Sequence, residues 1–213
     1  MDLSLTMIIE ALARAMTARD WLTHRHAQRV QRYAVALAGE AGIGDDLLIE
    51  ALDTAALLHD IGKLAIPDRL LQKPGPLTRD EYDLVKQHAT IGADILSAVA
   101  FSHSLVLIVR HHHENWDGTG HPDGLRDESI PIGARVLAIV DCYDALTSDR
   151  PYRRALSHDS AVGMIRERCG TMYDPEIADT FLRIVRGLRS APATERAGRA
   201  QAHAPCRPET TAV

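Results

Sequence analysis

Histidine and aspartate residues that suit metal binding recur along the first two-thirds of the chain. The adjacent His59 and Asp60 follow an apolar stretch and precede Gly62 and Lys63. Imidazole nitrogens and carboxylate oxygens are ligands for transition metals, and the nearby ammonium group of Lys63 adds a positive charge. The same side-chain types recur at inward-facing positions of other segments. Seven residues are therefore candidate metal ligands: His26, His59, Asp60, His88, His112, His113 and Asp141.

Seven donors are more than one metal ion uses, and they would suit two ions that share a bridging carboxylate. Mixed nitrogen and oxygen ligation favours Fe, Mn, Co, Ni or Zn over Mg or Ca. Two metals about 3.5–4 Å apart are a common arrangement for hydrolysis of a phosphate ester. Each residue alone also has a simpler explanation, as a packed core histidine or a hydrogen-bonded buried aspartate. Their number favours a metal centre.

Helices must position these residues, because apolar side chains recur at helical spacing and aromatic residues make up only 4% of the chain. The sequence predicts an all-α fold, with a capping box formed by Thr78 and Glu81 and Leu84 on the inward stripe of His88. The predicted helices cover residues 3–18, a segment closed by Gly42, a segment opened by Asp45 and Asp46 that reaches His59, and residues 79–99, 104–113, 132–148, 158–169 and 175–188.

Three adjacent histidines and two loops carry further candidates for ligand contact. The histidines, 111–113, fan out by about 100° each, so two can converge on one metal while the third points elsewhere. The glycine-rich loop that follows contains Gly118, Gly120 and His121, and it indicates either backbone close to a ligand or a tight surface turn. Arg150 and Arg153 lie in a basic loop, where they either bind phosphate or are solvated surface charges.

Composition limits the remaining possibilities. The 213 residues carry a net charge of -5, which argues against binding to a nucleic-acid polymer. No apolar run is long enough to span a membrane, and no secretory signal is recognisable at the N-terminus. Three cysteines without metal-binding spacing predict a reducing, cytoplasmic setting.

Several motifs in one order give the chain a resemblance to a known family. His59 to Lys63, His112 to Glu114, Asp117 to Pro122 and the stretch from Asp141 to Tyr152 resemble the HD-GYP domain, a branch of the HD superfamily of metal-dependent phosphohydrolases. The resemblance implies a single all-α HD-type domain whose metal site is built from several helices. The predicted organisation is an N-terminal helix at 1–18, the HD-GYP domain at 19–188 and a disordered tail at 189–213.

The resemblance implies a phosphodiesterase that converts cyclic di-GMP into linear pGpG and, in some members, into GMP. It implies two divalent metals, Fe or Mn: one bound by His26, His59, Asp60 and Asp141, the other by His88, His112 and His113, with Asp60 bridging. Asp60 and Lys63 would be catalytic, with Lys63 on the scissile phosphate. The substrate contacts would be Lys63, Gly118, Gly120, His121, Arg150 and Arg153.

Two departures from the family pattern bear on these expectations. His121 replaces the tyrosine of the Gly-Tyr-Pro signature; it can still stack or hydrogen-bond, and the change would either alter the grip on the substrate or add a pH-sensitive group. Leu22 lies where members with a third metal carry glutamate, so the sequence predicts two metals, with pGpG as the main product. Two alternatives stay open: a receptor that binds cyclic di-GMP without hydrolysing it, and an HD hydrolase of another cyclic dinucleotide or nucleotide. Too few residues precede the motifs for a sensor domain, so regulation is expected from a homodimer, from the redox state of the metals or from a separate signalling protein.

Overall fold

The computed structural model describes residues 3–19, 21–99, 101–149 and 154–190. Within these ranges every regular element is a helix, which confirms the all-α prediction. The elements are α1 (Leu3–Arg19), α2 (Trp21–Glu40), α3 (Asp46–Leu58), η1 (Ile61–Ala65), α4 (Asp68–Leu71), α5 (Arg79–Lys86), α6 (His88–Ala98), α7 (His103–His111), η2 (Asp127–Ser129), α8 (Ile132–Thr147), α9 (His158–Glu167) and α10 (Pro175–Ser190).

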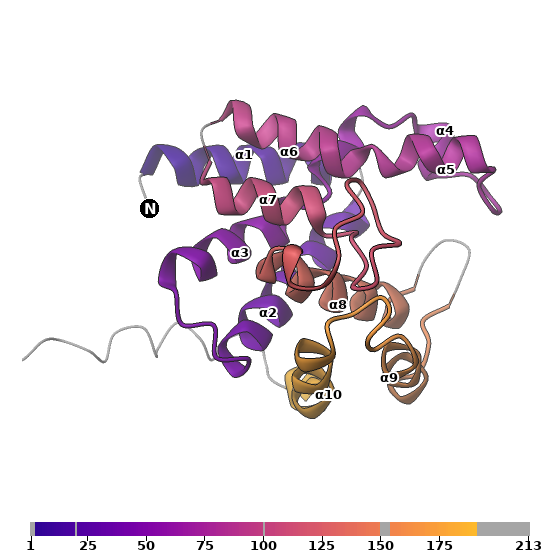
Figure 1. The fold of residues 1–213 in the computed structure, drawn as a ribbon. Coiled ribbons are helices and arrows are strands. Elements are labelled where there is room, and N and C mark those ends of the chain that lie inside the picture. Colours follow the sequence, from indigo (N-terminus) through magenta and orange to yellow (C-terminus); the bar gives the residue numbers. More distant parts are fainter. Residues whose placement is uncertain (1–2, 20, 100, 150–153, 191–213) are drawn as a thin grey trace, which may run out of the picture.

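One apolar core joins these helices. In Figure 1, α1, α6 and α7 lie above α3, α2 and α8, and α9 and α10 lie below them. Leu37, Leu52, Leu137 and Phe181 are fully buried between the layers, and Ile9 joins α1 to the same cluster. Aliphatic side chains dominate this core, as the low aromatic content predicts. The described part of the chain contains no helix both long and apolar enough to cross a membrane.

Local capping explains why several helices begin where they do. The Thr78 hydroxyl accepts a hydrogen bond from the Glu81 backbone N–H at 3.3 Å, and the Glu81 carboxylate accepts one from the Thr78 N–H at 2.8 Å. This confirms the predicted capping box. Asp45 caps α3 through the N–H groups of the first turn, and Ser157 caps α9. These bonds satisfy backbone donors that have no partner within the helix.

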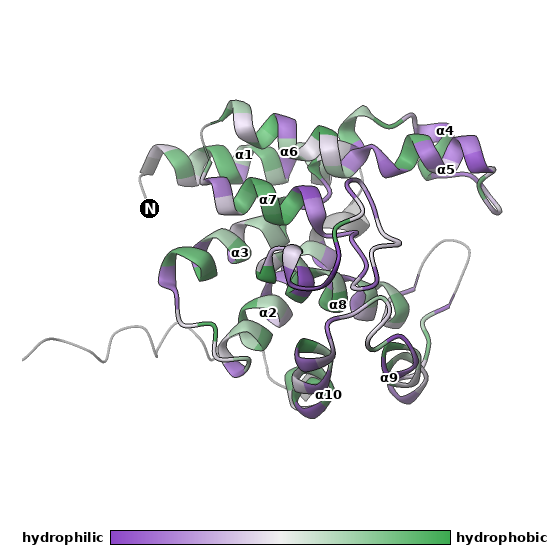
Figure 2. Cartoon of the chain, in the orientation of Figure 1, coloured by the Kyte–Doolittle hydropathy of each residue, from purple (hydrophilic) through white to green (hydrophobic). Residues whose placement is uncertain are grey.

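The prediction of one helix over residues 79–99 is wrong. The chain forms α5 and α6, which meet at Gln87, where the backbone N–H donates to the Leu84 carbonyl in a tighter, three-residue turn. α5 buries none of its residues and is largely hydrophilic (Figure 2), whereas α6 packs into the body of the protein. Leu84 is accordingly 44% exposed rather than inward-facing.

Two other boundaries differ from those predicted. The sequence placed no regular structure directly after His59, but η1 and the single turn α4 follow it. At the other end of the chain, α10 continues through Ser190, two residues into the predicted tail. The rest of that tail, residues 191–213, lies outside the described residues.

Candidate metal centre

Six of the seven predicted ligands form two groups of three. His26 on α2, His59 after α3 and Asp141 on α8 form the first group, called the acidic group here because it includes a carboxylate. The second, the histidine group, contains His88, His112 and His113, from the start of α6 and the end of α7. Within each group the ligand atoms lie within 4.8 Å of one another.

Asp60 lies between the two groups. Its Oδ2 atom is 3.6 Å from Nε2 of His59, and its Oδ1 atom is 3.7 Å from Nε2 of His88. The two oxygens therefore face different groups, as a bridging carboxylate must. Burial alone would raise the pKa of Asp60, but the positive charge of Lys63 and the neighbouring histidines hold this pKa well below its usual value. Lys63 donates to Oδ2 at 2.6 Å.

Backbone carbonyls orient three of the histidines. Nδ1 of His59, His88 and His112 lies 2.9, 2.7 and 2.6 Å from the carbonyl three residues earlier in the chain. A carbonyl only accepts hydrogen bonds, so Nδ1 carries the proton and Nε2 keeps its lone pair. Among the described residues, Nε2 of His59 and of His112 is buried without a hydrogen-bond partner. Buried nitrogens oriented in this way suit transition-metal ligation.

Protonation differs between the two groups. Burial lowers the pKa of all three members of the histidine group, that of His113 to about 3, so they are neutral and ready to ligate near pH 7. Burial would also lower the pKa of His26, but hydrogen bonds to Asp141 and Asp144 outweigh it and raise this pKa to about 9. A metal in the acidic group must therefore displace a proton.

Of the three adjacent histidines, His111 is the one that points away from the centre, as expected for one of them. Nε2 of His111 lies 2.9 Å from Oδ2 of Asp123, and its Nδ1 lies 2.9 Å from the Leu107 carbonyl. Glu114 is 3% exposed and accepts bonds from three backbone N–H groups, at residues 123–125. The sequence reasoning gave Glu114 no role of its own. Its carboxylate ties the glycine-rich loop to the end of α7.

The glycine-rich loop returns to the histidine group. A Cβ atom on Gly120 would lie 2.2 Å from the Asn115 backbone nitrogen, and Gly118 has a φ of +80°. The His121 N–H donates to the His113 carbonyl, and the two rings lie 5.0 Å apart. The loop is thus held against the centre rather than being a remote surface turn.

The predicted phosphate contacts are only partly described. Lys63 lies on η1 beside Asp60, with its side chain 34% exposed. Arg150 and Arg153 lie outside the described residues. Contact with substrate remains a prediction for Lys63, the loop residues and both arginines.

The sequence reasoning missed Asp144 and Arg29. Nδ1 of His26 lies 2.7 Å from Oδ2 of Asp144, and the Arg29 guanidinium donates to both Asp144 oxygens, at 2.6 and 2.9 Å. Spacing is the signal that could have found them: Arg29 follows His26 by three residues, and Asp144 follows Asp141 by three. Residues three apart share a helix face.

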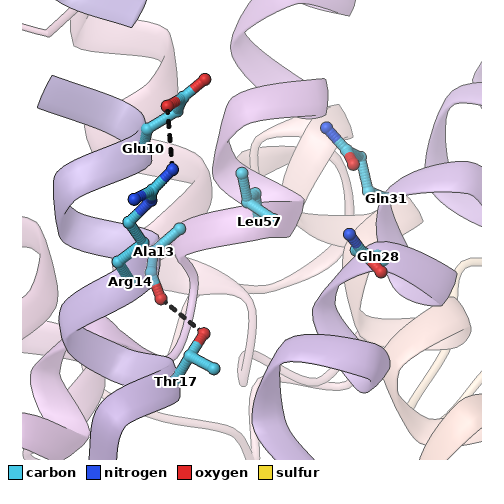
Figure 3. Close-up of a pocket in the computed structure, with 7 residues that line it drawn as sticks. All are labelled: Glu10, Ala13, Arg14, Thr17, Gln28, Gln31 and Leu57. Atoms are coloured by element: carbon cyan, nitrogen blue, oxygen red, sulfur yellow. Dashed lines mark hydrogen bonds and ion pairs between the residues drawn. The ribbon is translucent and has the colours of Figure 1, made fainter. Parts of the chain in front are cut away.

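A separate surface pocket of about 590 Å³ lies between α1, α2 and α3. Figure 3 shows that Arg14 turns toward Glu10 and Thr17 toward the Ala13 carbonyl, while Gln28 and Gln31 face them from α2. None of its lining residues is a candidate metal ligand. The pocket therefore belongs to a different part of the surface.

Known proteins resemble this chain in sequence and in fold. Residues 10–177 match the family model described as HD domain. A Thermotoga maritima protein named cyclic di-GMP phosphodiesterase is 41% identical over 83% of this chain and 48% of its own length. A Vibrio cholerae protein named 3'3'-cGAMP-specific phosphodiesterase 3 is 37% identical over 82% of this chain and 38% of its own.

Structural similarity agrees with these matches. The solved structure of Bd1817 from Bdellovibrio bacteriovorus superposes with a TM-score of 0.64 at 24% identity, over 78% of this chain and 53% of that one. The chain spans about half the length, or less, of the curated relatives compared here. The chain belongs to the HD domain family, in the HD-GYP branch that its motifs predict.

Proposed function

We propose that this protein is a metal-dependent phosphodiesterase that hydrolyses cyclic di-GMP to pGpG. The observation that carries the proposal is the placement of Asp60, whose two oxygens face two separate groups of three ligands. Such an arrangement suits two metal ions, and a pair of metal ions is a common device for phosphate-ester hydrolysis. The name of the Thermotoga maritima relative supports cyclic di-GMP as the substrate.

The acidic group would hold one metal and the histidine group the other, with Asp60 shared. Fe or Mn would fit this mixture of imidazole and carboxylate donors. When bound, the two ions would supply Lewis-acid stabilisation of the phosphate charge. Leu22 supplies no donor atom, so two metals per chain are expected rather than three.

Lys63 would stabilise charge on the scissile phosphate. Its ammonium lies at the bridging carboxylate and its side chain is partly exposed, so it can exchange one anionic partner for another at little cost in solvation. Gly118, Gly120 and His121 would line the adjacent side of the site. Arg150 and Arg153 would hold a phosphate or a guanine through their forked donors. The cytoplasmic setting inferred from the cysteine content is part of the same proposal.

The test is turnover of cyclic di-GMP by the full chain, reconstituted anaerobically with Fe²⁺ or Mn²⁺. Asp60→Asn should lower kcat/KM by at least about a hundredfold, because it removes the shared charged ligand. The control is Asp179→Asn, at an aspartate whose side chain is 70% exposed on α10, and it should leave kcat/KM unchanged. Metal analysis should give two ions per active chain, and three would contradict the two-metal prediction.

The same assay decides between the alternatives. Tight binding of cyclic di-GMP without product would make the protein a receptor. Faster turnover of 3'3'-cGAMP would assign it to the specificity named for the Vibrio cholerae relative. GMP that accumulates as fast as pGpG would overturn the proposed end product.

A further inference from the structure

His26 is held differently from the other oriented histidines. The rings of His59, His88 and His112 each face a neutral backbone carbonyl through Nδ1. His26 instead faces the carboxylate of Asp144 at 2.7 Å, and its Nε2 lies 3.0 Å from Oδ1 of Asp141. One ring is thus placed between two carboxylates, one on the metal side and one behind it.

Asp144 is itself held in place. Asp144 is 1% exposed, and the Arg29 guanidinium donates hydrogen bonds to both of its carboxylate oxygens in a forked contact. Ser148 accepts a bond from the same guanidinium at 2.8 Å and lies 3.3 Å from Oδ2 of Asp144. Arg29 and Ser148 therefore leave the carboxylate little freedom to rotate away from His26. Such a two-point contact fixes direction as well as distance.

Charge distinguishes the two ligand groups. The acidic group includes Asp141, and Asp144 lies directly behind its histidine; the histidine group contains three imidazoles and no carboxylate of its own. A carboxylate behind a ligating imidazole orients the ring and increases its basicity, and removal of such a partner costs about 10–100-fold in metal affinity. The two metal positions should therefore differ in strength.

We propose that Asp144, held by Arg29, is a positioning residue for His26 that makes the acidic group the tighter of the two metal positions. The inference rests on the proposed metal-dependent function, and it adds an order of filling. The first equivalent of metal enters the acidic group, and the second enters the histidine group. Asp144 does not touch the metal or the substrate.

Metal titration of the full, metal-free chain tests this without an activity assay. Co²⁺ is added at about pH 9 in the presence of a competing chelator, because displacement of the His26 proton then costs little affinity. Visible absorbance reports the affinity of each equivalent. In the unmodified chain two equivalents should bind, one tighter than the other. Asp144→Asn should weaken the tighter equivalent about 10–100-fold and leave the weaker one within about threefold.

A double-mutant cycle shows whether Asp144 acts through His26. His26→Gln should weaken the same equivalent, and adding Asp144→Asn to it should cause little further loss, because the contact is already absent. Additive losses would overturn the proposal. So would an equal weakening of both equivalents by Asp144→Asn, which is the result expected if Asp144 only stabilises the fold.

Asp174→Asn is the matched control. Asp174 is 5% exposed and accepts a bond from Arg135 at 2.7 Å, so the variant also disrupts a buried aspartate–arginine contact, but one without a metal ligand. It should retain both affinities. Should Asp144→Asn not fold, Arg29→Lys replaces it, since it keeps the charge, loses the forked grip and should weaken the tighter equivalent by a smaller factor.

The test separates this inference from the function it rests on. An unmodified chain that binds no Co²⁺ would refute the metal centre itself. An unmodified chain that binds two equivalents, together with an Asp144→Asn variant that binds them unchanged, would refute only the role of Asp144.

Discussion

Gly62 offers the sharpest structural test of how the fold positions the metal ligands. It lies on η1, two residues after Asp60, against the start of α6. A Cβ atom at this position would lie 1.9 Å from the His88 carbonyl oxygen and 2.6 Å from the Gly92 nitrogen. Both neighbours are backbone atoms, so neither can rotate away as a side chain would.

Gly62→Ala must therefore separate η1 from α6. The contact to the His88 carbonyl has to grow from 1.9 Å to at least 3.4 Å, the start of ordinary van der Waals contact. This movement shifts His88 relative to Asp60, and a misplacement of about 1 Å at a reaction centre costs about a hundredfold in rate. Overpacking adds a loss of about 1–3 kcal/mol in stability, which outweighs the gain of about 0.4–1 kcal/mol from a less flexible unfolded chain.

The assay combines three measurements on Gly62→Ala: turnover, bound metal per chain and thermal unfolding. We expect at least a hundredfold loss of kcat, a weakened histidine-group metal and a Tm lower by about 2–4 °C for each kcal/mol lost. Gly163→Ala on α9 is the control, because no atom lies within 4 Å of its added Cβ. The Gly163→Ala variant should keep full activity, and its free energy of unfolding should rise by up to about 1 kcal/mol. A Gly62→Ala enzyme with unchanged rate and metal content would refute this account of the packing.

Three further predictions concern the loop, the metal affinity and a helix cap. Glu114→Gln replaces one carboxylate oxygen, which accepts bonds from backbone N–H groups, with an amide NH₂ that can only donate. The variant should lower stability by about 1–3 kcal/mol and speed amide exchange at residues 123–125. Unchanged exchange there would contradict the anchoring role. His26, with its pKa of about 9 in the metal-free protein, must lose a proton to bind metal. Calorimetric metal affinity should therefore rise by up to about tenfold per pH unit above pH 7 and level off above about pH 9; a flat profile would show that His26 is not a ligand. Thr78→Ala should lower the free energy of unfolding by about 1 kcal/mol through loss of the α5 cap and leave the number of bound metals unchanged. Denaturant unfolding and metal analysis measure the two quantities, and a change in metal content would contradict the prediction.

Much of the fold was readable from local sequence. Helical spacing of aliphatic residues predicts the helices, and Asp45, Thr78 and Ser157 predict where three of them begin. These signals act within one or two turns of the chain, so no tertiary information is needed. The break at Gln87 was not readable, because it depends on α6 packing into the core while α5 stays in solvent.

The seven candidate ligands are also apparent from the sequence, because five histidines and two aspartates at inward-facing positions of several segments favour a metal centre as a set, although each alone has a simpler explanation. How these ligands divide into two groups is decided by the tertiary structure alone. Which histidines share a metal, and that Asp60 faces both groups, depends on contacts between helices far apart in the chain. The same holds for Asp144, which lies 118 residues from His26 and meets it only because α8 packs against α2. Residue types determine which metals can bind, and helix packing determines where each ion would lie and which side chains hold its ligands.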